Sequence, residues 1–243
     1  MLIIASRRAI FVTGEKEAIL IIVPELLDPK DFIISRKRKK YRFALFANSP
    51  LCFEFDEWDR TFRPDVLEIG AGNGRFAVEL ATRYPDQNFV AIDVKGDRLQ
   101  NGARLAQERR LVNVRFIRAR ADQIAELFDA KTLSTIWLTF SDPFPKRRSA
   151  GRRMTHPTFL TLYGRLLSPK GSLCIKHDNP AFFAWSLEQL VREKWHIDAL
   201  CFDLHEAPAG YFDDAKVLTT YESRWHAEGR ITQFVKAVQF DED

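Results

Sequence analysis

The sequence predicts an α/β fold built on a mostly parallel, doubly wound sheet. From residue 65 onward, short apolar runs alternate with amphipathic stretches, which is the pattern of strands and helices in such a sheet. A glycine-rich turn follows the first of these strands, and two further strand-like runs come late in the chain. We therefore expect one main domain with an antiparallel C-terminal edge, and 243 residues are enough to bury its core.

Five short apolar runs predict the parallel strands, which are 65–69, 88–93, 114–117, 135–140 and 173–176. Helices are expected at 75–84 and 156–167, because apolar side chains share one face there and a proline follows each segment. The runs 197–204 and 231–240 predict two more strands, which we expect to pair antiparallel at one edge of the sheet.

The first residues predict an N-terminal extension, 1–50, in front of the main domain at 51–243. The apolar runs 9–12 and 18–23 flank a short polar turn, so a hairpin and a flexible arm are both compatible with this segment. Five consecutive cationic side chains at 36–40 make the extension a basic arm.

The charge and cysteine content narrow the class of protein. The formal net charge is +4, and the cations cluster at 36–40 and 146–153, which favours a polyanionic partner. Cys52, Cys174 and Cys201 lack CxxC spacing, so neither a disulfide framework nor a metal site is expected.

The longest aliphatic runs are far shorter than a membrane span, and the N-terminus lacks signal-peptide features. We expect a cytoplasmic protein without a membrane partner.

Three alternating glycines, Gly70, Gly72 and Gly74, follow the first parallel strand and its acidic residue Glu68. Glycine lets the backbone turn sharply and approach a ligand without a Cβ in the way. A dinucleotide fingerprint would need its third glycine where this chain has Arg75, so the spacing does not favour pyrophosphate. The loop instead resembles the cofactor loop of class I S-adenosylmethionine-dependent methyltransferases.

A second acid, Asp93, ends the next strand, nineteen residues after Gly74. This is about where a carboxylate receives two ribose hydroxyls at the carboxyl edge of an α/β sheet. Arg120 and Asp122 follow the third strand, where they could flank an adenine ring. The alternative is that Glu68 and Asp93 only cap following helices or turns, but their combination with the glycines favours the cofactor.

The segment 141–153 carries the strongest functional signal. Asp142 directly follows the apolar run 135–140, and two prolines stiffen the exit from that strand. Five cations come next, which are Lys146, Arg147, Arg148, Arg152 and Arg153. Because the α region is disfavoured before proline, Asp142 and Phe144 are expected to be extended. A fixed acid beside a basic loop predicts an enzyme that acts on a polyanion.

Motifs spread along the chain carry a resemblance to one family. They are Leu67-Glu68-Ile69-Gly70-Ala71-Gly72-Asn73-Gly74, Ser141-Asp142-Pro143-Phe144-Pro145-Lys146-Arg147-Arg148, Arg152-Arg153, Thr155-His156, Lys176-His177-Asp178 and Thr219-Thr220-Tyr221-Glu222-Ser223-Arg224. Over roughly residues 40 to 238, these motifs and their order resemble the bacterial tRNA (guanine-N7)-methyltransferase family. The Asp-Pro-aromatic-Pro-Lys run and the late Thr-x-Tyr-Glu are specific to it.

The resemblance implies methyl transfer from S-adenosyl-L-methionine to N7 of guanine at position 46, in the variable loop of tRNA. It implies a catalytic Asp142, which also joins the cofactor site with Glu68, Gly70, Gly72, Gly74, Asp93 and Arg120. The positions implied for substrate binding are Lys146, Asp178, Thr219, Thr220, Tyr221 and Glu222, with Arg152 and Arg153 expected to hold phosphates. The chain departs from the family at Arg120, usually an acid or asparagine, at Phe144, usually tryptophan, and at His177, commonly threonine.

The expected chemistry needs no base, because N7 of guanine carries a free lone pair. Positioning would supply most of the acceleration, and the Asp142 carboxylate would stabilise the positive charge that develops on the purine. Asp178, after the next strand, could take either role. Since N7 faces the deep major groove of A-form RNA, the base must lie in a loop or leave its tertiary contacts.

Two other functions are compatible with the sequence: a class I methyltransferase for another RNA or a small purine, and an RNA-binding scaffold without turnover. Intact Asp142, Lys146 and Glu222 argue against the scaffold. The expected partner is tRNA, and the oligomeric state, monomer or homodimer, stays open. His156 is expected to cap a helix or to face RNA.

Overall fold

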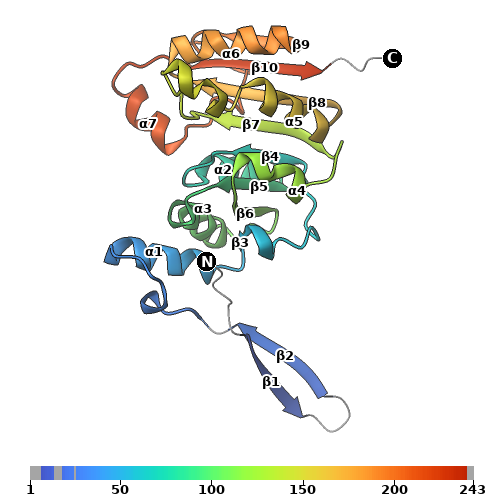
Figure 1. Ribbon diagram of the computed structural model, residues 1–243, viewed down its shortest axis with the longest axis vertical. Coiled ribbons are helices and arrows are strands. Elements are labelled where there is room, and N and C mark those ends of the chain that lie inside the picture. The colour runs from blue at the N-terminus through green and yellow to red at the C-terminus, as the bar shows by residue number, and fades with distance from the viewer. Residues whose placement is uncertain (1–6, 14–17, 25, 240–243) are drawn as a thin grey trace.

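An eight-stranded sheet forms the centre of the computed structural model, which describes residues 7–13, 18–24 and 26–239 (Figure 1). The strand order across the sheet is β3-β6-β5-β4-β7-β8-β10-β9. The strands are β3 (Cys52–Glu54), β4 (Val66–Ile69), β5 (Phe89–Asp93), β6 (Val114–Arg118), β7 (Leu133–Thr139), β8 (Leu167–His177), β9 (Trp195–Cys201) and β10 (Gln233–Gln239). Strand β10 pairs antiparallel with β8 and β9, and the other pairs are parallel.

Helices cover both faces of this sheet. They are α1 (Lys37–Ala47), α2 (Arg75–Arg83), α3 (Gly96–Glu108), α4 (Ile124–Leu127), α5 (Pro157–Leu166), α6 (Pro180–Arg192) and α7 (Thr220–His226), with 3-10 turns η1 (Pro29–Asp31), η2 (Phe55–Glu57), η3 (Ala121–Gln123) and η4 (Arg147–Arg152). Alternate residues of β4 point to opposite faces, so Val66 packs in the core beneath α2 and α3. Leu67 and Ile69 pack in the core beneath α4, α5 and α6. The doubly wound α/β prediction is therefore confirmed.

The predicted elements are present with small differences at their ends. All five expected parallel strands are observed, although β8 starts earlier than expected because residues 167–172 also extend the sheet. The helices expected at 75–84 and 156–167 are α2 and α5. The late strands are β9 and β10, which pair antiparallel at one edge as predicted; residue 240 lies outside the described residues.

The N-terminal segment contains a hairpin and a helix. Strands β1 (Arg7–Thr13) and β2 (Ala18–Pro24) pair antiparallel in a separate sheet, so the hairpin alternative is correct; its turn, 14–17, lies outside the described residues. Helix α1, which the sequence did not predict, packs on α3. Its Phe46 ring lies against Gly96 at the start of α3. Within the described ranges, no helix is long and apolar enough to cross a membrane.

The order of the sheet reverses at β4, since the chain continues to β5 on one side and later returns to β7 on the other. In open α/β sheets, ligands bind at such a switch point, outside the carboxyl ends of the strands. The glycine loop after β4 and the loop after β7 that carries Asp142 both start at this position, because β4 and β7 are adjacent parallel strands. Helix α7 lies at the same edge, on the left of Figure 1.

Candidate active site

The glycine loop leaves open space at the carboxyl end of β4. Gly70, Gly72 and Gly74 have φ angles of 75°, 59° and 69°, in the left-handed region that favours glycine. A Cβ at Gly70 or Gly72 would meet no atom within 4 Å, whereas a Cβ at Gly74 would lie 2.5 Å from the Phe116 ring. The first two glycines therefore leave room for a ligand, and the third permits close packing beneath it.

Glu68 and Asp93, the two acids predicted to contact the cofactor, both accept hydrogen bonds from backbone N–H groups. Glu68 is 2% exposed and accepts hydrogen bonds from Thr139 Oγ1 at 2.8 Å and from the Ala77 N–H of α2 at 3.2 Å. Burial raises the pKa of Glu68 to about 7. The capping alternative for this residue is thus present in the structure, and Glu68 fixes the start of α2 relative to the glycine loop.

Asp93 links the glycine loop to the next strand. Its Oδ2 accepts the Gly72 N–H at 2.9 Å and its Oδ1 accepts the Lys95 N–H at 2.8 Å. The side chain is half-buried, and burial raises its pKa. Each carboxylate oxygen has a further lone pair, so Asp93 can still accept from ligand hydroxyls.

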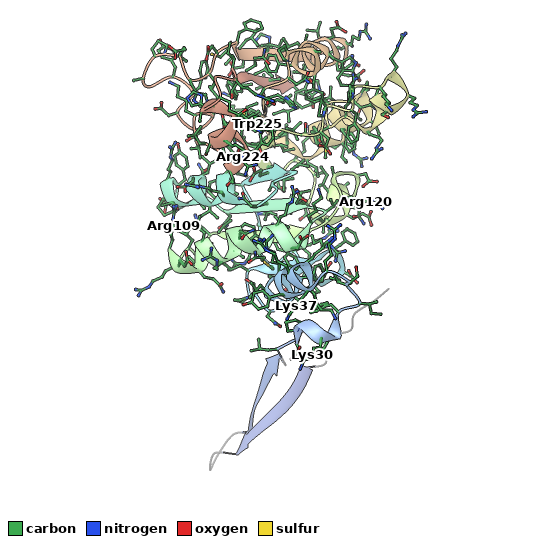
Figure 2. The ribbon with its side chains drawn as sticks, turned by 90° about the vertical axis from the view of Figure 1, so that its left-hand side faces the viewer. Lys30, Lys37, Arg109, Arg120, Arg224 and Trp225 are labelled. Carbon is green, nitrogen blue, oxygen red and sulfur yellow. The ribbon has the colours of Figure 1, made fainter. Side chains whose placement is uncertain are left out.

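Arg120 lies beyond β6 and pairs with its neighbour Asp122. Its Nε and Nη2 donate to the two carboxylate oxygens of Asp122 at 2.9 and 2.7 Å. Both side chains are exposed at the edge viewed in Figure 2, where Arg120 lies to one side of α7. This fork holds the guanidinium plane in one orientation.

Asp142 follows β7 on a sharply turned backbone. Phe140 has a φ angle of 52°, so the chain bends before it reaches Ser141 and Asp142. The Asp142 side chain is exposed, and no described residue donates a hydrogen bond to it. The expectation that Phe144 is extended is wrong, because its φ angle is 39°; contacts from Arg153 to this stretch of backbone override the local preference.

Two side chains hold the backbone on either side of Asp142. His177 Nε2 lies 2.7 Å from the Ser141 carbonyl oxygen. Arg153 donates from Nε to the Pro143 carbonyl at 3.1 Å and from Nη2 to the Phe144 carbonyl at 3.1 Å. From the sequence, Arg153 is predicted to contact phosphates, and no role is predicted for His177.

Asp178 lies at the end of β8, close to α7. Its Oδ2 accepts from the Tyr221 hydroxyl at 3.2 Å and from Arg230 Nη1 at 3.1 Å. The Arg230 guanidinium in turn stacks on Trp225, 3.9 Å from the ring centroid. The side chain of Asp178 is only 7% exposed, so this carboxylate is more enclosed than that of Asp142.

The predicted substrate segment 219–222 forms the start of α7. Thr219 is the N-cap and forms a capping box with Glu222. Glu222 is 1% exposed and accepts from Lys176 Nζ at 2.6 Å and from His205 Nε2 at 2.9 Å. Burial alone would raise the pKa of Glu222, but the hydrogen bonds from His205 and Lys176 hold it below its ordinary value.

Thr220 and Tyr221 are the exposed members of this segment. Thr220 Oγ1 accepts a hydrogen bond from Asn73 Nδ2 of the glycine loop at 2.7 Å. The Tyr221 ring lies 5.3 Å from that of Phe140. Figure 2 shows Arg224 and Trp225 of the same helix on the edge where the parallel strands end.

The basic loop folds into η4. Lys146, Arg147, Arg148 and Arg152 are exposed, and Arg152 stacks on Phe144 at 4.5 Å. A second exposed basic surface is provided by α1, where Figure 2 shows Lys37 at the same edge of the molecule. Both surfaces can attract a polyanion.

Other features of the described residues do not compete with this site. His156 caps α5 by accepting a hydrogen bond from the Thr158 N–H at 3.3 Å. The prediction that it caps a helix is therefore confirmed. No group of three or more His, Cys, Asp or Glu in the described part of the chain is arranged to hold a metal ion. A cavity of about 530 Å³ lies at the opposite ends of β4 and β7, but three acids line it, Asp198, Asp213 and Asp214, against the single cation Lys236, which does not suit a polyanion.

The comparison with known proteins identifies close relatives. A family model described as "Putative methyltransferase" matches residues 62–234. A tRNA (guanine-N(7)-)-methyltransferase from Brevibacillus brevis is 34% identical over 198 residues, which cover 80% of this chain and 91% of that protein. The protein of the same name from Geobacillus thermodenitrificans is 37% identical over 175 residues, with 71% and 79% covered.

Solved structures share the fold at lower identity. The 16S rRNA methyltransferase KamB has a TM-score of 0.58 at 16% identity, covering 78% of this chain and 95% of that chain. A 16S rRNA (adenine(1408)-N(1))-methyltransferase variant from Catenulisporales acidiphilia, with cosubstrate SAM, has a TM-score of 0.51 at 12% identity, covering 96% and 98%. These similarities show a methyltransferase fold.

Proposed function

The chain belongs to the tRNA (guanine-N7)-methyltransferase family, and we propose that it methylates N7 of a guanine in the variable loop of tRNA, with Asp142 as the catalytic residue. S-adenosylmethionine is the methyl donor. The observation that carries the assignment of Asp142 is the exposed carboxylate that follows β7, across the switch point of the sheet from the open glycine loop.

The glycine loop and its neighbours fit this cofactor. When bound, S-adenosylmethionine supplies an electrophilic methyl group on a sulfonium. Gly70 and Gly72 leave the space that such a ligand needs, and Asp93 retains lone pairs for the ribose hydroxyls. Arg120 would border the adenine side, with its plane held by Asp122. Glu68 would act by fixing the loop and α2, since its carboxyl group is buried.

The division of roles between the two acids follows from their surroundings. Asp178 already accepts from Tyr221 and Arg230, whereas Asp142 has no hydrogen bond to another described residue. We assign the direct role to Asp142, which would accept from N1 and N2 of the guanine and stabilise positive charge as N7 takes the methyl group. Asp178 would hold α7 and its Tyr221 beside the base.

Binding of tRNA would use the exposed cations beside Asp142. Guanine N7 is inaccessible in the deep major groove of A-form RNA, so the base must be presented from a loop or extruded. Lys146, Arg147 and Arg148 would hold flanking phosphates, and Arg152 would contribute from its stack on Phe144. Thr220 and Tyr221 would face the substrate, whereas Glu222 would support them from the core.

The direct test is methyl transfer from labelled S-adenosylmethionine to unmodified tRNA, followed by aniline cleavage at 7-methylguanosine. We expect a single cleavage in the variable loop. A tRNA with 7-deazaguanosine at that position lacks the nucleophilic nitrogen, and it should bind without being methylated. Label on this tRNA, or label elsewhere in the natural one, would reject the proposed reaction.

The role of Asp142 is tested with Asp142→Asn. Loss of one preorganised electrostatic contact in an active site typically reduces kcat on the order of 10²–10³-fold, and we expect a loss of this size with tRNA binding retained. The exposed Asp86→Asn, which changes charge equally but lies on the α2–β5 connection, is the matched control. Wild-type turnover in Asp142→Asn would reject the assignment.

A further inference from the structure

We propose that His177 and Arg153 are positioning residues that together hold the Asp142 carboxylate in place by binding the backbone carbonyls around it. The inference rests on the proposed function, because it concerns the same acid. The two side chains come from different elements: His177 ends β8, and Arg153 follows η4. Together they contact the carbonyls of Ser141, Pro143 and Phe144.

The contacts of His177 define its tautomer. Nδ1 accepts the Asn179 N–H at 2.9 Å, so this nitrogen carries no proton, and Nε2 must donate to the Ser141 carbonyl at 2.7 Å. The residue is 3% exposed, and the ring packs 4.5 Å from that of Phe182. Burial lowers the pKa of His177, which favours the same neutral form. The imidazole therefore connects the end of β8 to the peptide that precedes Asp142.

The contacts of Arg153 hold the other side of the acid. Its Nε and Nη2 donate to two successive carbonyls, and its guanidinium stacks on Trp185 at 4.4 Å. The residues at 143 and 145 are prolines without N–H groups, so carbonyl oxygens are the main polar groups by which this backbone can be held. These contacts also explain how Phe144 keeps its positive φ angle, which its surroundings must impose.

Asp142 lies between the held carbonyls, and its own side chain is exposed. An acid on a proline-rich connection would otherwise depend on that connection alone for its position. Because a shift of about 1 Å in a reacting group can reduce a rate roughly 100-fold, such support matters for turnover more than for RNA affinity. The proposed role of Arg153 therefore differs from that of Arg147 and Arg148, whose exposed side chains are available to bind phosphates.

The first test is Arg153→Lys, which keeps the positive charge but cannot donate to both carbonyls in the same geometry. We expect kcat to fall roughly 100-fold, with the tRNA Kd and its salt dependence close to wild type. Arg192→Lys, on the exposed end of α6, controls for the substitution itself and should retain the wild-type kcat. Wild-type kcat in Arg153→Lys, or lost tRNA affinity with kcat unchanged, would overturn the proposal.

The second test compares His177→Gln with His177→Leu. The Gln amide can still donate to the Ser141 carbonyl, so its kcat should lie between those of wild type and His177→Leu, at unchanged tRNA affinity. Equal kcat in wild type and His177→Leu would overturn the role of the imidazole. If these variants do not fold, the ¹⁵N signals of His177 in the wild-type protein decide the question: the Nε2–H neutral tautomer supports the proposal and any other form contradicts it.

The two proposals fail in different ways. Absence of 7-methylguanosine with the wild-type protein would reject the proposed function. An active wild-type protein, with Arg153→Lys and His177→Leu equally active, would leave the function intact and reject the positioning roles alone.

Discussion

Lys176 and Glu222 form a buried ion pair, in which Nζ lies 2.6 Å from Oε2 and the side chains are 0% and 1% exposed. The same ammonium group donates to the carbonyls of Ala215 and Val217. The pair therefore ties β8 to the segment that leads into α7. The sequence predicts Glu222 at the substrate, and its burial supports our proposal that it acts from the core on Thr220 and Tyr221.

Lys176→Met should be strongly destabilising, because it leaves the Glu222 carboxylate buried without its cationic partner. We expect the free energy of unfolding to fall by about 3–5 kcal/mol, measured by chemical denaturation. Lys236→Met, which breaks the exposed pair with Asp198 at 2.8 Å, should cost about 0–1 kcal/mol. Similar losses in both variants would contradict the importance of burial.

The double variant Lys176→Met/Glu222→Gln tests the same relationship from the other side. Since Gln carries no charge, the uncompensated charge is gone, and part of the stability lost in Lys176→Met should return. A double variant less stable than Lys176→Met alone would show that other contacts of Glu222 dominate, such as that from His205.

The buried carboxyl group of Glu68 should make stability depend on pH. Its pKa is about 7 in the folded protein against an ordinary value of 4.5, so the folded state binds the extra proton between these values. The free energy of unfolding should therefore be higher at pH 5 than at pH 7, by roughly 2 kcal/mol. Glu68→Gln should flatten this decline, and the exposed Glu188→Gln on α6 should leave it unchanged. An unchanged pH profile in Glu68→Gln would assign the dependence to other groups.

Gly72→Ala separates the cost of backbone strain from the loss of ligand space. A left-handed φ angle costs an Ala about 1–2 kcal/mol, and this should apply equally to Gly210→Ala, where the φ angle is 85° and no atom lies within 4 Å of the new Cβ. Only Gly72→Ala should also weaken S-adenosylmethionine binding, by isothermal titration calorimetry, because its methyl group enters the predicted cofactor space. Equal affinity in the two variants would move the cofactor away from this loop.

The basic loop should determine the salt dependence of tRNA binding. Replacing Arg147 and Arg148 with Ala should weaken binding and reduce the slope of log K against log salt by about 1.5, since each lost phosphate contact accounts for about 0.7–0.9. Replacing Arg104 and Arg192 removes the same charge from other exposed helix positions and should change the slope little. Equal slopes in the two double variants would make the effect one of net charge.

The parallel core of the fold could be predicted because its strands are short apolar runs with turn residues between them. The edge strand β3 was missed, since three residues are too few to show a period. Helix α1 was missed because its first four residues are all cationic, which looks like a solvated run; burial of Ala44 and Phe46 against α3 stabilises it. Such tertiary packing leaves no local pattern.

The arrangement of the candidate site could be predicted where short sequence motifs determine it. It could not be predicted where residues far apart in the sequence come into contact. The glycines and the position of Asp142 after its strand follow from neighbouring residues. The contacts from His177 to Ser141, and from Arg230 to Asp178, join residues 36 and 52 positions apart. Arg153 was identified by its charge, but its geometry shows a guanidinium committed to carbonyl oxygens, which charge alone does not reveal.

The hydrogen bond from Asn73 to Thr220 connects the turn after β4 with the first residue of α7. A ligand that displaced either partner would break this hydrogen bond and so couple occupancy of the turn to the start of α7. Thermodynamics then requires reciprocity: if occupancy at the turn alters the RNA dissociation constant by some factor, RNA alters occupancy at the turn by the same factor. We expect Asn73→Ala to bring that factor closer to one, so that each substrate has less effect on the dissociation constant of the other.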